Sequence, residues 1–165
     1  MVEELAQREV LSHNLIWVAD PALEPNFFST PDNWRDMGDG KPYAPANGDA
    51  LTFDPTKTAG GKQGTVSDAI DDVGNLLAGL SLTALTTAKG YTGKVSLNFD
   101  LGVSNGAGVT LAGGTLSTST TAGAGLFTVG AVGQAPPGQN YSNSWSATTL
   151  TGSGGFLVAD GARWC

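Results

Sequence analysis

Short alternating runs of apolar and polar residues dominate the second half of the chain. They begin at Leu80, Val95 and Val109, and further runs follow at 126–129 and 156–158. Such alternation, bounded by glycine, is typical of short β-strands that bury one face. We therefore expect an all-β fold. The residues expected to share its core are Leu80, Leu82, Val95, Leu97, Val109, Leu111, Phe127 and Val129.

Two all-β architectures produce this pattern. One is an antiparallel β-sandwich of hairpins, and the other is a single-stranded parallel β-solenoid, or β-helix, in which successive coils stack. The runs at Leu80, Val95 and Val109 start at nearly equal intervals. That regular advance favours the solenoid. The Gly113-Gly114 pair fits either the tight turn of a hairpin or a corner between strands of a coil.

The segment around Ile70 offers a competing helical pattern. Apolar residues recur from Ile70 onward at helical spacing, and Ser67 or Asp68 is placed to cap a helix. Gly74 interrupts the pattern, which costs about 1 kcal/mol relative to alanine. We expect a helical turn at 68–73 and a strand from about residue 77.

Composition divides the chain into two regions. The sequence has 165 residues, which fits one domain. Most acidic residues and prolines lie before residue 76, whereas most glycines lie after it. We expect a leader-like segment at 1–14 and a single β domain at 15–165. Within it, 15–75 form an irregular acidic cap region and 76–165 form Gly/Ser/Thr-rich coils.

Charge and cysteine content exclude several classes of partner and site. The net charge is −7 with only eight basic residues, which argues against a nucleic-acid partner. The one cysteine, Cys165, rules out an intrachain disulfide and a cysteine-based metal site. No stretch approaches the roughly 18 apolar residues of a membrane-spanning helix, so we expect no transmembrane segment.

The cap region and first coils resemble a known class of proteins. Trp17, "DNW" with Trp34, and "KPYAPANGDALTF" ending at Phe53 precede "GYTGKVSLN", "LGVSNGAGVTLAGGTLSTS" and "LFTVGA". This order, over residues 15–131, resembles bacterial extracellular β-solenoids, namely planctomycete surface proteins and autotransporter-like passengers. The resemblance implies right-handed parallel coils behind an aromatic-capped N-terminal region.

A second resemblance concerns cellular address. "LAQREVLS" resembles the Leu-Glu-Pro-Arg-x-Leu-Leu-Ser signature near the N-termini of planctomycete surface proteins. Ala6, Gln7 and Val10 depart from that signature, and "LIWV" is too short for a signal-peptide core. The resemblance implies an extracellular or cell-surface location. The matching residues are Leu5, Arg8, Leu11 and Ser12.

Residues suited to catalysis are sparse. His13 is the only histidine and lies within the leader-like segment, so we interpret it as a surface or leader residue and not as part of a hydrolytic triad. Glycoside hydrolysis needs paired carboxylates, and lyases combine acids with bases. The coils offer few such groups, so we do not expect the protein to be an enzyme. The ionisable residues of the coils are Asp100, Asp160, Lys89, Lys94 and Arg163.

Two other sets of residues suit ligands. Aspartates between glycines suit Ca²⁺, but their spacing matches no known calcium loop, so we interpret Asp36, Asp39, Asp49 and Asp54 as turn formers. Exposed aromatic rings suit glycans. For Trp17 and Trp34 we favour a different role, covering the open first coil, where burial of each is worth about 2–3 kcal/mol. The glycan candidates are Trp17, Trp34, Tyr43, Tyr141 and Trp145.

These observations favour a non-catalytic, adhesin-like or structural β-solenoid module at the cell surface, without a cofactor. Two alternatives stay open. One is a carbohydrate-binding or polysaccharide-processing β-helix protein, and the other is a trimeric fibre-type β fragment. The partners expected are extracellular glycans or cell-surface components.

Overall fold

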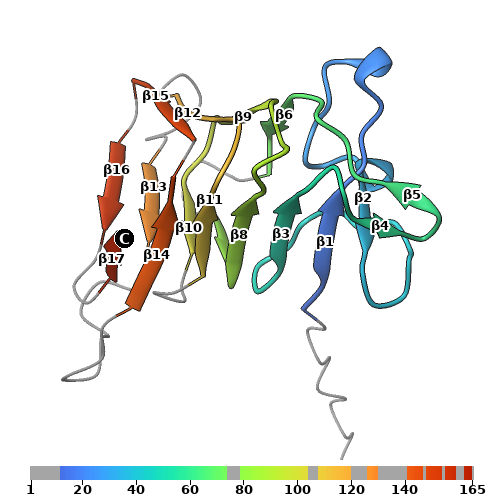
Figure 1. The fold of residues 1–165 in the computed structure, drawn as a ribbon, viewed down its shortest axis with the longest axis horizontal. Coiled ribbons are helices and arrows are strands. Elements are labelled where there is room, and N and C mark those ends of the chain that lie inside the picture. Colours follow the sequence, from blue (N-terminus) through green and yellow to red (C-terminus); the bar gives the residue numbers. More distant parts are fainter. Residues whose placement is uncertain are drawn as a thin grey trace, which may run out of the picture.

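The chain folds almost entirely into short β-strands joined by turns (Figure 1). The computed structural model describes residues 12–73, 79–103, 108–119, 126–129, 141–146, 148–153, 155–158 and 162–164. Within these residues, helical structure is confined to two 3-10 turns, η1 (Pro21–Leu23) and η2 (Pro31–Asn33). The expected all-β class is therefore confirmed.

The largest sheet has seven strands and runs the length of the molecule. Its neighbouring strands pair in parallel, except for the antiparallel pair of β1 and β2. In sheet order the strands are β17 (Ala162–Trp164), β14 (Tyr141–Trp145), β11 (Val109–Leu111), β8 (Ala84–Thr87), β3 (Ala50–Phe53), β1 (Asn14–Trp17) and β2 (Trp34–Asp36).

Two further sheets of four parallel strands complete the walls. The β7 sheet contains β16 (Gly155–Val158), β13 (Leu126–Val129), β10 (Leu101–Val103) and β7 (Leu80–Leu82). The β6 sheet contains β15 (Thr149–Gly152), β12 (Thr115–Thr118), β9 (Lys94–Leu97) and β6 (Ala69–Asp71). A small antiparallel hairpin, β4 (Thr58–Ala59) and β5 (Lys62–Gln63), belongs to none of these sheets.

From β3 onward, the chain visits the seven-stranded sheet, the β6 sheet and the β7 sheet in turn, and then repeats the circuit. Within the β7 sheet, Leu80 pairs with Leu101, and Leu101 pairs with Phe127. One circuit therefore separates these residues. The runs at Leu80, Val95 and Val109 instead lie in three different sheets, so their equal spacing is not the advance of a circuit. Parallel pairing between circuits also differs from the antiparallel sandwich considered above.

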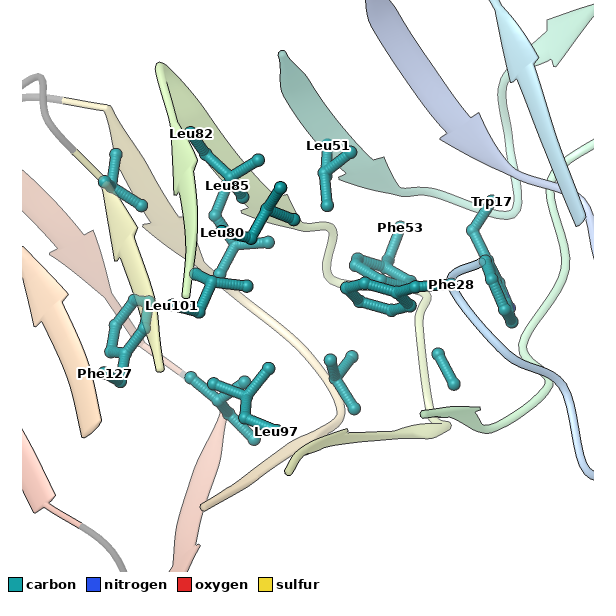
Figure 2. Close-up of a cluster of buried hydrophobic side chains, with 14 of the residues drawn as sticks. Trp17, Phe28, Leu51, Phe53, Leu80, Leu82, Leu85, Leu97, Leu101 and Phe127 are labelled. Carbon is teal, nitrogen blue, oxygen red and sulfur yellow. The ribbon is translucent and has the colours of Figure 1, made fainter. Parts of the chain in front are cut away.

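The alternating apolar residues meet in one core between the sheets. All eight of the core residues expected from the sequence are at least 96 % buried and belong to a single cluster. Figure 2 shows this cluster continuing from Trp17, Phe28 and Phe53 to Leu101 and Phe127. Because strand residues alternate between two faces, each run places its apolar positions inward and its polar positions outward. The core prediction is confirmed.

The segment at 68–73 forms no helical turn, which corrects the expectation from the sequence. Residues 69–71 form β6, which pairs in parallel with residues 95–97 of β9. On its other side, the Ile70 N–H donates to the Asn26 carbonyl at 2.9 Å. Pairing on both sides satisfies the backbone better than an isolated turn, so tertiary pairing overrides the local pattern. Residues 74–78 lie outside the described part, and β7 begins at Leu80.

The Gly113-Gly114 pair forms a corner between sheets and not a hairpin turn. It connects β11 in the seven-stranded sheet to β12 in the β6 sheet. Gly114 has a φ of +73°, and a Cβ on Gly113 would lie 2.3 Å from the Ala88 carbonyl oxygen. Glycine is needed here because the chain turns in a left-handed conformation against the preceding circuit.

The cap region covers the first strand of every sheet. Strand β2 is the outermost strand of the seven-stranded sheet beyond β1, and its Asp36 backbone N–H and carbonyl bond to Lys41 and Gly40 within the cap region. Phe27 bridges to Ile70 beside β6, and the Gly48 N–H donates to the Ser81 carbonyl beside β7 at 2.8 Å. We call this the cap side of the molecule. Exposed sheet edges invite unwanted pairing, and here all three are occupied.

Candidate functional site

Two of the aromatic glycan candidates lie inside the cap region. The side chains of Trp17 and Trp34 are completely buried. Their rings meet edge to face with centroids 4.8 Å apart, and Phe28 and Phe53 pack against the Trp34 ring at 5.1 and 5.5 Å. A sugar-stacking platform needs an exposed ring face. Their burial therefore favours the covering role over sugar binding.

The polar ends of these buried aromatic residues are all paired. The Trp17 indole Nε1–H donates to the Ser67 hydroxyl at 2.9 Å, and that of Trp34 donates to the Phe28 carbonyl at 3.1 Å. The Tyr91 hydroxyl donates to the Ser67 carbonyl at 3.0 Å, and burial raises the pKa of Tyr91. Buried polar groups cost little when they are hydrogen-bonded. These aromatic residues therefore form a buried cluster in which the polar groups are hydrogen-bonded.

Tyr43 is half-buried and already in contact with protein groups. Its ring stacks on His13 with centroids 4.1 Å apart, and its hydroxyl donates to Asp39 Oδ2 at 2.9 Å. This hydrogen bond raises the pKa of Tyr43, while the Lys41 backbone N–H is the main cause that lowers the pKa of Asp39. Tyr141 and Trp145 lie in β14, but their side chains are outside the described part.

The four candidate calcium ligands each accept a backbone N–H nearby in the sequence. Such bonds are typical of Asx turns and related loops. Among the described residues, no three His, Cys, Asp or Glu side chains form a group that could hold a metal ion. The geometry favours their interpretation as turn formers. The acceptor and donor pairs are Asp36 with Gly38, Asp39 with Lys41, Asp49 with Ala46 and Asp54 with Thr56.

His13 has a defined place at the surface of the cap region. Its backbone N–H donates to Asp49 Oδ1 at 2.7 Å, and its ring Nδ1 lies 3.5 Å from the same oxygen. Asp49 is 99 % buried. The contact fixes the start of β1 to the turn before β3. This joins two parts of the cap region, and it gives His13 a structural role.

The Asp100 side chain and the Lys94 backbone make contacts between successive circuits. Asp100 Oδ1 accepts the Leu126 N–H at 2.9 Å, which ties one circuit to the first residue of β13. The Lys94 backbone N–H donates to Asp68 Oδ1 at 2.8 Å in the same manner. Asp160 and the Arg163 side chain lie outside the described part. Asp100 therefore connects the corner before β10 to the start of β13.

Asp71 is an unusual ionisable group that the sequence analysis missed. Its side chain is fully buried, and Oδ1 accepts the Val73 N–H at 3.0 Å. Oδ2 has no hydrogen-bond partner within the part that the structure describes. Burial, with a smaller contribution from Asp72, raises the pKa of Asp71 to about 7. A strand prediction at 69–71 would have revealed this buried acid, because Ala69 and Asp71 then lie on the same face.

Rows of hydroxyl side chains follow the outer faces of two sheets. They arise because matched outward positions in successive circuits carry serine or threonine. Parallel strands lie about 4.8 Å apart, so each row repeats at that spacing. The rows are Thr52, Thr86 and Thr110 in the seven-stranded sheet, of which Thr52 is buried, and Ser96, Ser117 and Thr151 in the β6 sheet.

The sorting-signature residues lie mostly outside the described part. Leu5, Arg8 and Leu11 are not described, and Ser12 is exposed just before β1. Within the described residues, no helix is long and apolar enough to span a membrane. Comparison with protein-family models, curated proteins and solved structures found no match to this chain.

Proposed function

We propose that this chain is a non-catalytic β-solenoid module of the cell surface, with a structural or adhesive role. In this proposal each circuit through the three sheets is one right-handed coil. The observation that carries it is the hydroxyl row of the β6 sheet, in which Ser96, Ser117 and Thr151 occupy matched positions on successive strands. The extracellular address rests on the resemblance of "LAQREVLS" to a sorting signature.

The hydroxyl row suits many weak contacts with an extended partner. Thr151 is exposed, and Ser96 and Ser117 are half-exposed. Each hydroxyl both donates and accepts, and one hydrogen bond contributes only about 0.5–1.5 kcal/mol net. Repetition along an extended surface multiplies such contacts into useful avidity. An extended polymer, such as a cell-wall glycan, has the matching shape.

Among the described side chains, neither alternative function gains a comparable observation. A carbohydrate-binding groove needs open aromatic rings, whereas Trp17 and Trp34 are buried and Tyr43 is stacked on His13. A trimeric fibre needs neighbouring chains to complete its core. Here the core residues of successive circuits already bury one another within one chain.

The adhesive role is testable with insoluble polysaccharides. We expect the purified chain to cosediment with at least one of cellulose, chitin and peptidoglycan, without releasing reducing ends. A triple alanine variant of Ser96, Ser117 and Thr151 should weaken this binding about tenfold or more, since each 1.4 kcal/mol is tenfold. The matched control is a triple alanine variant of the scattered, exposed Thr30, Thr58 and Thr92. Equal weakening by both variants would remove the row from the proposal.

Location and catalysis have separate readouts. Antibody labelling of intact cells, lost after external protease treatment, is the expected result for a surface protein. Labelling that needs permeabilised cells would contradict the proposed address. Release of reducing ends that disappears in Asp100→Asn, with the circular dichroism spectrum unchanged, would favour the carbohydrate-processing alternative.

A further inference from the structure

Asp71 lies in an apolar column at the cap-side edge of the β6 sheet. Its partner on β9 is Leu97, which is fully buried. On the other side of β6, Phe27 bridges in parallel to Ile70. Continuing that register by one residue places Phe28, also fully buried, beside Asp71. The Asp71 carboxyl therefore lies between two apolar side chains, and its Oδ2 has no hydrogen-bond partner within the described residues.

The charged groups around β6 do not balance a negative charge on Asp71. Asp72 adds a like charge next to it, and the side chain of Lys94, the first residue of β9, is exposed. An ionised Asp71 would thus have neither water nor a counter-ion, and burial of a lone charge is costly. Besides Asp71, the charged residues in 24–29, 68–73 and 94–97 are Glu24, Asp68, Asp72 and Lys94.

The contact between residues 26–29 and β6, which we call the cap bridge, is short. The Phe28 N–H donates to the Ile70 carbonyl and the Ile70 N–H donates to the Asn26 carbonyl, both at 2.9 Å. Ser29 donates its N–H and its hydroxyl to the Asp72 carboxylate. On its other side, β6 pairs over three residues with β9, which is held in turn by β12. The cap bridge is therefore easier to open than the pairing of β6 with β9.

We propose that the cap bridge is a pH-sensitive contact, which opens when Asp71 ionises and water reaches its carboxyl. This conformational device goes beyond the proposed adhesive role. In the closed form, burial raises the pKa of Asp71 to about 7, whereas a hydrated aspartate has a pKa of about 3.9. The ionised carboxyl therefore favours the open form. The opening constant of the cap bridge rises about tenfold per pH unit between about pH 4 and pH 7, or about 1,000-fold in all.

Hydrogen exchange at the cap bridge measures this opening. The readouts are the amides of Phe28 and Ile70, whose N–H groups form the bridge. Corrected for intrinsic exchange rates, their protection should fall about 1,000-fold from pH 4 to pH 8 in the wild type. It should change little in Asp71→Asn, which cannot ionise. Asp54→Asn, which removes a carboxylate from another turn of the cap region, is the matched control and should keep the wild-type fall.

Urea separates opening of the cap bridge from unfolding of the whole chain. Local opening exposes little surface, so exchange at Phe28 and Ile70 should depend weakly on urea. The Leu85 amide, which donates to Gly108 from the interior strand β8, should show a much stronger dependence. Equal urea dependence at these sites, or protection of Phe28 and Ile70 that is constant with pH, would overturn the proposal. Both readouts use the wild type, so they remain decisive if Asp71→Asn fails to fold, and neither depends on polysaccharide binding.

Discussion

The buried carboxyl of Asp71 makes a sharp prediction about stability and pH. Asp71→Asn keeps an oxygen that can accept the Val73 N–H, which lies 3.0 Å from Oδ1 in the wild type. It also removes the ability to ionise. Asp71 is fully buried, and its pKa is raised to about 7 chiefly by that burial. In the unfolded chain an aspartate has a pKa of about 3.9.

The sign and size of the effect follow from these two pKa values. The folded state holds the proton more tightly, so the wild type is most stable below about pH 4 and loses stability as pH rises toward about 7. The pKa difference of about three units corresponds to about 4 kcal/mol at 1.36 kcal/mol per unit. The variant cannot ionise and is spared this loss. Asp71→Asn should therefore match the wild type near pH 4 and exceed it by up to about 4 kcal/mol near pH 8.

Urea unfolding followed by circular dichroism, at several values between about pH 4 and pH 8, measures this difference. Asp54→Asn is the matched control, since it removes one negative charge from a turn and keeps the Oδ1 acceptor for Thr56. This control measures the effect of losing one negative charge from the chain. A difference between wild type and Asp71→Asn that is constant with pH would refute the reasoning.

Substitutions of Trp34, Gly114 and Asp100 test the structural roles assigned above. Trp34→Ala should lower the free energy of unfolding by about 3–5 kcal/mol, because the ring is fully buried; an unchanged thermal melt would place the ring at the surface. Gly114→Ala and Gly61→Ala both put alanine at a φ near +73°, and this left-handed conformation costs about 1–2 kcal/mol of stability. At Gly114 the new Cβ would lie 2.6 Å from Tyr91 Cδ1, whereas at Gly61 it would meet nothing within 4 Å. The melting temperature of Gly114→Ala should therefore fall further than that of Gly61→Ala. Asp100→Ala should cost about 1–3 kcal/mol in urea unfolding by leaving the Leu126 N–H unpaired, whereas Asp100→Asn, which keeps an acceptor, should cost less.

The core was predictable because its signal is local. Alternation with a period of two shows which residues of a strand point inward, and Val95 and Leu97 illustrate this without knowledge of their neighbours. Which strands pair is a different question. Leu80 pairs with Leu101, across a separation that no regular spacing in the sequence revealed. Corners and intervening turns vary in length, so the circuits have no fixed period.

Because a helical turn was expected at 68–73, the burial of Asp71 was not predicted. Read as a helix, Asp71 is an acid in the first turn, exposed and favourable. Read as a strand, it shares the inward face with Ala69. Local propensity cannot decide between these readings, because the pairing of β6 with β9 decides it. Similarly, tryptophan at positions 17 and 34 suits both covering the end of the core and stacking on a sugar, and only the burial of the two rings separates these roles.

The change in composition near residue 75 follows from how the two regions satisfy their backbone hydrogen bonds. From β7 onward, parallel neighbours supply donors and acceptors from one circuit to the next. The cap region must instead block three edges with irregular chain, and turns leave N–H groups without backbone acceptors. Aspartates such as Asp36, Asp49 and Asp54 accept those N–H groups. The acidic character of the cap region is thus a consequence of closing the sheets, and it requires no metal ion or cationic ligand to explain it.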